Sequence, residues 1–320
     1  MITGISGFAG SYLAEHLLSL PSCDLWGVSL GPTENIDGLR DRIHYLPEDL
    51  ADPSAAERVL ITARPDLIFH LAAQAFVPVS WQDPWSTMEN NIRAEVNLLH
   101  LVAKHEIPSR ILIVGSNEEY GRVEPDDLPI TEETALRPDS PYGVSKIAQD
   151  FLALQYFISH NLYTVRLRPF NHSGPRQNDR FVASDFAKQI AEIEAGEREP
   201  VIHVGNLEAS RDFTDVRDMV RAYVLALERG VPGEVYNVGS GRAYSIRQLL
   251  DFYLSQTDAP VRVQADPGRS RPSDTPVTLC DSTKFRRQTG WEPEIPFEQT
   301  LRDTLDYWRA RVKGVKKQTA

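Results

Sequence analysis

The chain lacks most features of secreted, membrane or nucleic-acid-binding proteins. It has two cysteines, Cys23 and Cys280, far apart and without metal-type spacing, so we expect neither a disulfide framework nor a metal site. No apolar run approaches the roughly 18 residues of a membrane helix, and the N-terminus lacks a signal-peptide pattern. A net charge of −11 argues against nucleic acid or an anionic membrane as the main partner. We therefore expect a cytoplasmic protein that binds neither nucleic acid nor a membrane.

What the chain does have is enough length and apolar content for one large or two medium domains, with 320 residues of which 41% are hydrophobic. Short apolar segments alternate with segments of helical periodicity, which predicts an α/β fold with a doubly wound parallel (Rossmann) sheet. The predicted strands lie within 25–30, 67–73, 110–116, 163–169 and 234–240, and the predicted helices within 9–20, 55–63, 88–105 and 141–160.

The pattern becomes less regular from about residue 171, which indicates a second, smaller α/β domain. We expect a dinucleotide-binding domain at 1–170 with 212–240. A substrate domain would then comprise 171–211 with 241–320.

A glycine-rich segment lies at the start of the chain. Gly4, Gly7 and Gly10 are spaced by three and open a predicted helix. Glycines let a backbone approach a pyrophosphate, and a helix N-terminus offers free N–H groups to it. The spacing differs from the commonest dinucleotide fingerprint, so a small-residue turn that packs a helix on a strand is the alternative. Because only three residues precede Gly4, we expect a short first strand.

Two further positions bear on the cofactor. Asp49 and Leu50 follow a predicted strand, where they can meet an adenine edge, although Asp49 alone also suits a helix cap. Ser29 stands where chains that bind NAD carry a carboxylate for the ribose 2′-hydroxyl. The missing acid favours a 2′-phosphate, with Arg40 and Arg42 as nearby cations, but both NADP(H) and NAD(H) stay open.

The segment "PYGVSK" sets Tyr142 four residues before Lys146, on one face of a predicted helix. A nearby cation lowers the pKa of a phenol from about 10, so this pair predicts a tyrosine that exchanges a proton with a carbonyl or alcohol oxygen. The alternative is an amphipathic helix with a buried tyrosine and a surface lysine. Ser116 and Glu118 follow the predicted strand 110–116, at the strand end where ligands of doubly wound sheets bind.

In order along the chain, these motifs resemble the extended short-chain dehydrogenase/reductase family: G-x-x-G-x-x-G, a serine at a strand end, and Y-x-x-x-K. The resemblance implies a triad of Ser116, Tyr142 and Lys146, with Lys146 also holding the nicotinamide ribose. It also implies a cofactor site that includes Gly4, Gly7, Phe8, Ala9, Gly10, Ser29, Asp49, Leu50, Leu71, Ala72, Ala73, Asn91, Tyr142, Lys146 and His172.

Later segments resemble the GDP-sugar branch of this family, notably 168–175, 204–218 and 271–274. This resemblance implies a GDP-sugar substrate, with His172 beside the nicotinamide. Cationic side chains suit a diphosphate, and arginine can grip it with two hydrogen bonds. The implied substrate-binding residues are Asn171, Lys188, Arg211, Arg271 and Asp274, the last where the pattern usually has glutamate.

Two activities occur in this branch: reduction of GDP-4-dehydro-6-deoxy-D-mannose and 4,6-dehydration of GDP-mannose. The loop "GFAG", the helix start "YGVSK" and the absence of an Arg/Ser-rich run after residue 30 favour the reductase by resemblance. Glu118 could serve as the additional acid or base of a dehydratase, but a glutamate at this position also occurs in the reductase pattern, so it does not separate the two activities. A dinucleotide sensor without turnover is a third alternative. The resemblance also implies a homodimer formed through the helices at 88–105 and 141–160; the alternative is that the apolar faces of these helices are internal core.

Overall fold

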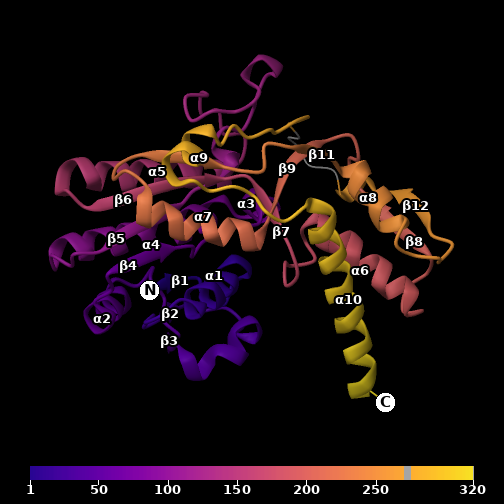
Figure 1. Ribbon diagram of the computed structural model, residues 1–320, viewed down its shortest axis with the longest axis horizontal. Helices are drawn as coiled ribbons and strands as arrows, with labels where there is room; N and C mark the ends of the chain where they lie inside the picture. The colour runs from indigo at the N-terminus through magenta and orange to yellow at the C-terminus, as the bar shows by residue number, and fades with distance from the viewer. Residues whose placement is uncertain (270–274, 320) are drawn as a thin grey trace.

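The computed structural model describes residues 1–269 and 275–319, and its centre is a parallel sheet (Figure 1). Seven strands form this sheet in the order β10-β6-β5-β4-β1-β2-β3. All of its strand pairs are parallel, as in a Rossmann fold. In chain order the strands are β1 (Ile2–Thr3), β2 (Trp26–Val28), β3 (His44–Leu46), β4 (Leu67–His70), β5 (Arg110–Val114), β6 (Tyr163–Pro169) and β10 (Val235–Val238).

Helices cover both faces of this sheet. On β5, Leu112 packs in one core with α1 (Phe8–Ser19) and α7 (Val216–Arg229). Its neighbours Ile111 and Ile113 pack in a second core with α2 (Pro53–Ala63), α4 (Pro84–Lys104) and α5 (Pro141–His160). Successive side chains of a strand point to opposite faces, so burial on both faces explains why the strand segments are almost continuously apolar.

The remaining chain builds a smaller region beside the sheet, at the right of Figure 1. Two small sheets have the orders β11-β9-β7 and β12-β8. Their strands are β7 (Asn171–Ser173), β8 (Val201–Val204), β9 (Ser210–Asp215), β11 (Ala243–Ser245) and β12 (Arg262–Ala265). Helices α6 (Val182–Glu194), α8 (Ile246–Leu254) and α10 (Phe297–Thr319) share a third core with β8, β9 and β11, in which the rings of Phe213 and Phe297 stack 4.8 Å apart.

Short elements connect these layers. They are α3 (Val77–Gln82), α9 (Thr283–Thr289) and the 3-10 turns η1 (Glu34–Arg42), η2 (Asn117–Glu119), η3 (Pro125–Asp127) and η4 (Pro267–Arg269). Within the described ranges, no helix is long and apolar enough to cross a membrane.

The predicted fold class, the five predicted strands and the four predicted helices are confirmed. The first strand is short, with two residues, as expected. Strand β9 pairs with β7 and β11 rather than with the main sheet, and β10 is the late strand that joins the large sheet. The division into two domains at the stated boundaries stays a prediction.

Candidate active site

A cavity of about 990 Å³ lies at the carboxyl ends of the main strands and extends to the smaller region. Its lining combines predicted cofactor, catalytic and substrate residues that come from distant parts of the sequence. From the main sheet these are Gly4, Gly7, Phe8, Ala9, Gly10, Leu71, Ala73, Ser116, Glu118, Tyr142 and Lys146, and from the smaller region Asn171, His172 and Arg211. Carboxyl ends of parallel strands are where doubly wound folds bind ligands, so this cavity is the candidate active site.

The glycine loop has the geometry that a pyrophosphate site requires. Gly4 has a φ of +72°, a conformation that favours glycine. A Cβ atom on Gly10 would collide with the carbonyl oxygen of Gly4, so the helix can pack this closely only without a side chain there. Helix α1 has no side-chain cap at Gly7 and no acidic residue in its first turn. Its first N–H groups and the positive end of its dipole are therefore available to an anion, and the loop fits a dinucleotide.

Ser116 lies directly after β5 and is nearly buried at 7% exposure. Its Oγ accepts a hydrogen bond from the Glu118 N–H at 3.1 Å, and its own N–H donates to Glu119 Oε1 at 2.8 Å. The Ser116 hydroxyl lies close enough to the Tyr142 phenol to lower the pKa of that phenol. The hydrogen bonds with Glu118 and Glu119 hold Ser116 in place at the strand end.

Burial of the Tyr142 phenol raises its pKa above the usual value of 10. The nearby Ser116 hydroxyl opposes this effect, whereas the negative charges of Glu118 and Glu119 add to it. The prediction that a cation lowers the pKa of this phenol is wrong for this structure, because desolvation outweighs any such effect. The phenol is therefore neutral at neutral pH and keeps its proton available for a hydrogen bond.

Lys146 is 4% exposed, and its Nζ donates to the backbone carbonyl of Val114 at 2.8 Å. The ammonium lies 6.0 Å from the centroid of the Tyr142 ring. Burial lowers the pKa of Lys146 to about 8, while the nearby charges of Glu95 and Glu119 raise it. The lysine is therefore buried with the tyrosine, which excludes the interpretation of a surface lysine.

Two more predicted residues belong to the same cavity. Glu118 is partly buried, and its charge acts on Tyr142. The His172 ring lies parallel to the Phe8 ring, with centroids 6.0 Å apart, and its Nδ1 donates to the Phe170 carbonyl at 3.2 Å. Burial lowers the pKa of His172, which favours a neutral ring above the glycine loop.

Some predicted cofactor residues stabilise the cavity wall instead of lining it. The Ala72 N–H donates to Thr3 Oγ1 at 3.1 Å and lies against Gly4. Asn91 is fully buried, accepts a hydrogen bond from the Gln74 N–H at 2.7 Å and donates to Ser145 Oγ at 3.0 Å. Asn91 thus joins the loop after β4 to helix α5, and any effect on a cofactor acts through that loop.

The residues predicted to bind the adenosine end of the cofactor also lie outside the cavity lining. Asp49 accepts a hydrogen bond from the Ala51 N–H at 2.8 Å, as a turn residue does. Leu50 is 4% exposed within the core of α2 and α4, so its side chain packs helices together. The Ser29 hydroxyl donates to Ser6 Oγ at 2.9 Å. Their roles in cofactor binding stay predictions.

A tyrosine links Ser29 to one of the two predicted cations. The Tyr45 hydroxyl donates to the Ser29 carbonyl at 2.9 Å, and the Arg40 guanidinium lies 4.2 Å from the centroid of the Tyr45 ring. Arg42 instead donates to the backbone carbonyl of Leu18 at 2.9 Å. The structure therefore brings Arg40, rather than Arg42, next to Ser29.

On the substrate side, Asn171 and Arg211 line the cavity. Asn171 Oδ1 is buried and has no hydrogen-bond partner in the part of the chain that the structure describes. Arg211 is anchored by hydrogen bonds to the carbonyls of Ser210 at 2.9 Å and Thr275 at 2.7 Å. Both are therefore placed to meet a polar ligand.

Lys188 differs from these two residues because it does not belong to the cavity lining. Its Nζ is paired with Asp179 at 2.6 Å and with Glu192 at 3.7 Å. Arg271 and Asp274 lie outside the described residues.

Two arginines that sequence reasoning missed also line the cavity. Arg180 lies 5.6 Å from the centroid of the Phe76 ring, and Arg269 is paired with Asp185 at 2.5 Å. Neither belongs to a recognisable motif, because chain folding alone brings these loops to the cavity mouth. They add two guanidinium groups to the lining of the cavity.

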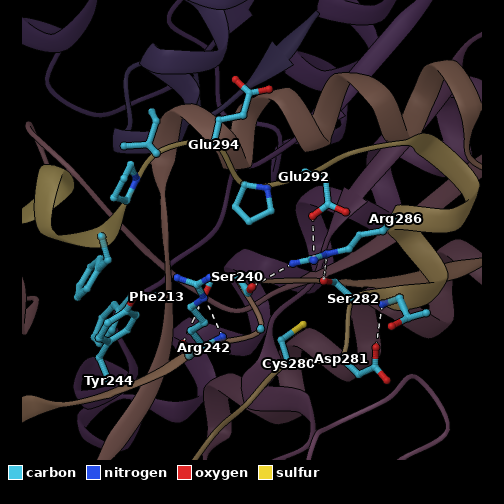
Figure 2. Close-up of a pocket in the computed structure, with 16 residues that line it drawn as sticks. Phe213, Ser240, Arg242, Tyr244, Cys280, Asp281, Ser282, Arg286, Glu292 and Glu294 are labelled. Carbon is cyan, nitrogen blue, oxygen red and sulfur yellow. Dashed lines mark hydrogen bonds and ion pairs between the residues drawn. The ribbon is translucent and has the colours of Figure 1, made fainter.

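A second, smaller cavity of about 540 Å³ lies on the other side of Phe213, which borders both cavities (Figure 2). Its Arg286 donates to Ser282 Oγ at 2.9 Å and to the Ser240 carbonyl at 2.9 Å, and pairs with Glu292 at 2.8 Å. These contacts join α9 to the loop after β10. Arg286 thus serves internal packing rather than a ligand.

Comparison with known proteins agrees with this geometry. A sequence model of the GDP-mannose 4,6 dehydratase family matches residues 1–304. The chain is 35% identical over 312 residues to GDP-6-deoxy-D-mannose reductase of Pseudomonas aeruginosa, covering 98% of this chain and 97% of that protein. It is 29% identical to GDP-mannose 4,6 dehydratase 1 of Arabidopsis thaliana, over 96% of this chain and 88% of that protein.

Solved structures extend the comparison to three dimensions. The RMD protein of Pseudomonas aeruginosa, solved with NADPH, matches with a TM-score of 0.84 and 32% identity over 97% of this chain and 98% of that chain. A Thermotoga maritima UDP-glucose 4-epimerase, solved with UDP-glucose, matches with a TM-score of 0.88 and 29% identity over the same shares. The chain therefore belongs to the GDP-mannose 4,6-dehydratase family of the extended short-chain dehydrogenases/reductases, whose members are NAD(P)-dependent enzymes.

Proposed function

We propose that this protein uses NADPH or NADH to reduce the C4 keto group of GDP-4-dehydro-6-deoxy-D-mannose, giving GDP-D-rhamnose. The observation that carries the proposal is that Ser116, Tyr142 and Lys146 line the same cavity as the glycine loop, with the Tyr142 phenol kept neutral by burial. Reduction of a ketone requires a hydride and a proton. A neutral phenol supplies the proton, so this protonation state suits the reductive direction.

The bound dinucleotide supplies the hydride. The Tyr142 hydroxyl donates its proton to the oxygen at C4 as negative charge develops there, and Ser116 holds that oxygen with a hydrogen bond. Lys146 would hold a ribose hydroxyl of the dinucleotide, and its positive charge would favour the phenolate that Tyr142 becomes. One proton leaves the phenol for each ketone reduced, and it is replaced before the next turnover.

Cationic and polar groups on the smaller region support a sugar-nucleotide substrate. Asn171 and Arg211 line the cavity together with Arg180 and Arg269. Guanidinium groups form charge-assisted hydrogen bonds with phosphate, so these residues would offset the net charge of −11 near the ligand. Arg271 and Asp274, which lie in the undescribed segment, are proposed substrate contacts on the resemblance alone.

GDP-mannose 4,6-dehydration is the second candidate. The observation that favours it is Glu118, whose carboxylate lies in the cavity near Tyr142 and can act as the additional acid or base that elimination of water needs. Glu118 fits a reductase equally well as a substrate contact. The reductase is preferred because the sequences of the glycine loop and of the start of helix α5 resemble those of the reductases in this family.

Substrate tests separate the two candidates. Purified protein incubated with GDP-4-dehydro-6-deoxy-D-mannose and NADPH or NADH is expected to oxidise the dinucleotide and form a GDP-6-deoxyhexose, detected by absorbance and by NMR of the sugar. If the protein instead dehydrates GDP-mannose and leaves the keto sugar unreduced, the reductase proposal is wrong and the second candidate stands.

We also propose that the protein is a homodimer through α4 and α5. On α5, Val144, Phe151 and Ile158 are 42%, 50% and 68% exposed and lie seven residues apart, so they form one apolar stripe. Trp85 on α4 is 70% exposed. Light scattering of the wild type should give twice the monomer mass, and Phe151→Glu with Ile158→Glu should give monomers. The cytoplasmic location stays a prediction.

A further inference from the structure

Next to Ser116 lies a buried group of charged side chains that the proposed reaction has not used. Glu119 ends the turn η2, Asp150 lies on α5, and Arg166 and Arg168 lie on β6. None of these four side chains is more than 7% exposed, and none belongs to the cavity lining. We call them the buried charge cluster.

One member of the cluster contacts the backbone of Ser116. The Ser116 N–H donates to Glu119 Oε1 at 2.8 Å, while Ser116 Oγ accepts from the Glu118 N–H at 3.1 Å. The two hydrogen bonds run in opposite directions across the turn η2, as in a capping box. The backbone has only two soft dihedral angles per residue, so a fixed N–H limits the direction in which the Ser116 side chain leaves the backbone.

The residue before Ser116 makes room for this acid. A Cβ atom on Gly115 would collide with Glu119 Oε1, so the carboxyl group can reach the Ser116 N–H only because residue 115 has no side chain. Gly115 lies directly after β5 and lines the cavity. The end of this strand is therefore shaped to receive the carboxyl group of Glu119.

Arg168 joins this acid to helix α5. Its Nε donates to Asp150 Oδ2 at 2.7 Å and lies 2.8 Å from Glu119 Oε2. Asp150 follows Lys146 by four residues, about one helical turn, and also pairs with Arg166. One guanidinium group thus connects the turn after β5 to the helix that carries the catalytic tyrosine and lysine.

The contact with Ser116 does not depend on the charge of Glu119. Burial and the negative charge of Asp150 raise the pKa of Glu119, and the positive charge of Arg168 opposes that rise. A carboxyl group has an oxygen that accepts a hydrogen bond in the neutral acid as well as in the carboxylate. The role of Glu119 toward Ser116 is therefore that of a hydrogen-bond acceptor.

We propose that Glu119 is a positioning residue for Ser116: its Oε1 fixes the backbone of the serine, and Arg168 ties this carboxyl group to the helix of Tyr142. The inference rests on the proposed reductase function, in which Ser116 and Tyr142 meet the same oxygen at C4. A misplacement of about 1 Å can lower a rate by about 100-fold, so a rigid connection between the strand end and α5 affects kcat.

The variant Glu119→Met nearly keeps the length of the side chain and removes the acceptor. Its kcat should fall by about 10- to 100-fold, while the KM for the sugar nucleotide changes by less than about 3-fold, because the residues that line the cavity are unchanged. The matched control is Glu119→Gln, which removes the charge but keeps an oxygen for the Ser116 N–H. Its kcat should stay within about 3-fold of the wild type. Equal losses in the two variants would show an effect of charge and overturn the inference.

A double-mutant cycle tests whether Glu119 acts through Ser116. In a Ser116→Ala background no hydroxyl is left to position, so Glu119→Met should lower kcat by less than about 3-fold further. If the two losses multiply instead, Glu119 acts elsewhere and the inference is wrong. If the wild type only dehydrates GDP-mannose, the proposed function fails, and the same cycle measured with that substrate still tests the inference.

Hydrogen exchange reports the contact without turnover. Peptides that cover residues 110–121 should exchange faster at the Ser116 amide in Glu119→Met than in the wild type or Glu119→Gln, measured by mass spectrometry. Unchanged exchange in Glu119→Met would overturn the inference while leaving the proposed function in place.

Folding is controlled with a further variant. If circular dichroism shows that Glu119→Met does not fold, Glu119→Asp keeps the acid and withdraws its oxygens by one methylene group. Its kcat should fall in the same direction by a smaller amount. Wild-type kcat in a folded Glu119→Asp would also overturn the inference.

Discussion

The two walls of the active-site cavity are built differently. On the wall formed by the main sheet, the functional groups are backbone N–H groups of the glycine loop and short or rigid side chains at strand and helix ends, such as Ser116 and Tyr142. On the wall formed by the smaller region, the candidate substrate contacts include long charged side chains, of which Arg211 lines the cavity and Lys188 does not.

This difference shows what positions each kind of group. A glycine at a helix start or a residue four places along a helix is placed by the backbone, and local sequence specifies the backbone there. A lysine side chain is long and flexible, so its ammonium goes to whichever carboxylate the tertiary structure brings near. Lys188 illustrates this effect, since Asp179 and Glu192 hold it.

The largest expected effect tests the cavity wall that the main sheet forms, which we call the sheet wall. Tyr142→Phe removes the proton donor and should lower kcat by about 10²- to 10⁴-fold while NADPH binding persists, because the ring and Lys146 remain. Stopped-flow or steady-state rates and fluorescence titration measure the two properties. Tyr156→Phe on the same helix is the control and should keep wild-type rates. Unchanged turnover in Tyr142→Phe would remove the catalytic role of this wall, and signalling without turnover would favour the sensor alternative.

The glycine loop gives the next effect. In Gly10→Ala the new Cβ meets the Gly4 carbonyl, so either the helix or the loop must move. We expect a loss of about 1 to 3 kcal/mol in the free energy of unfolding, together with weaker dinucleotide binding. Denaturant unfolding and fluorescence titration measure these changes. Gly38→Ala has open space around its Cβ and should change neither. Tight NADPH binding by Gly10→Ala would contradict the argument that the glycine loop can bind the dinucleotide only when residue 10 has no side chain.

On the substrate wall, a matched pair of variants sharpens the comparison. Arg211→Met removes a cation of the cavity and should raise the KM for the sugar nucleotide by about 10- to 100-fold, as expected for a hydrogen bond to a charged group. Lys188→Met removes a cation that is paired elsewhere and should raise KM by less than about 3-fold. If both variants raise KM equally, Lys188 leaves Asp179 and Glu192 when substrate binds. Long side chains would then not be held away from the cavity by internal ion pairs, and the difference drawn between the two walls would be smaller.

The smallest expected effect concerns the cofactor. Arg40 lies over Tyr45, which is hydrogen-bonded to Ser29, so Arg40→Gln should weaken NADPH binding by about 3- to 10-fold and leave NADH binding unchanged. The ratio of the two dissociation constants is the measurement. Arg42→Gln is the control, since Arg42 contacts the Leu18 carbonyl. An equal loss for both dinucleotides would exclude a role in recognising the 2′-phosphate.

Much of the sheet wall was predictable from sequence. The alternation of strands and helices, the three glycines, Ser116 and the Tyr142 and Lys146 pair all lie where the patterns placed them. Each depends on a backbone period or on a turn that only glycine permits, and such features act over a few residues.

The protonation state of Tyr142 was not predictable, because the phenol pKa depends on how completely the folded chain excludes water. The same reason applies to Leu50 and Asn91, which were predicted to bind the cofactor. In the folded chain Leu50 packs in the core between helices, and Asn91 anchors the loop after β4. Arg180 and Arg269 carried no signal at all, as loops far apart in sequence meet only at the cavity.

The amino-acid order alone determined the parallel sheet, the anion-binding loop and the tyrosine and lysine on one helical face, because hydrogen-bonding periods and steric limits are local. The tertiary structure decided which charges are paired and how completely the Tyr142 phenol is removed from water. Those properties depend on desolvation and on distances between residues that the chain brings together only after it has folded.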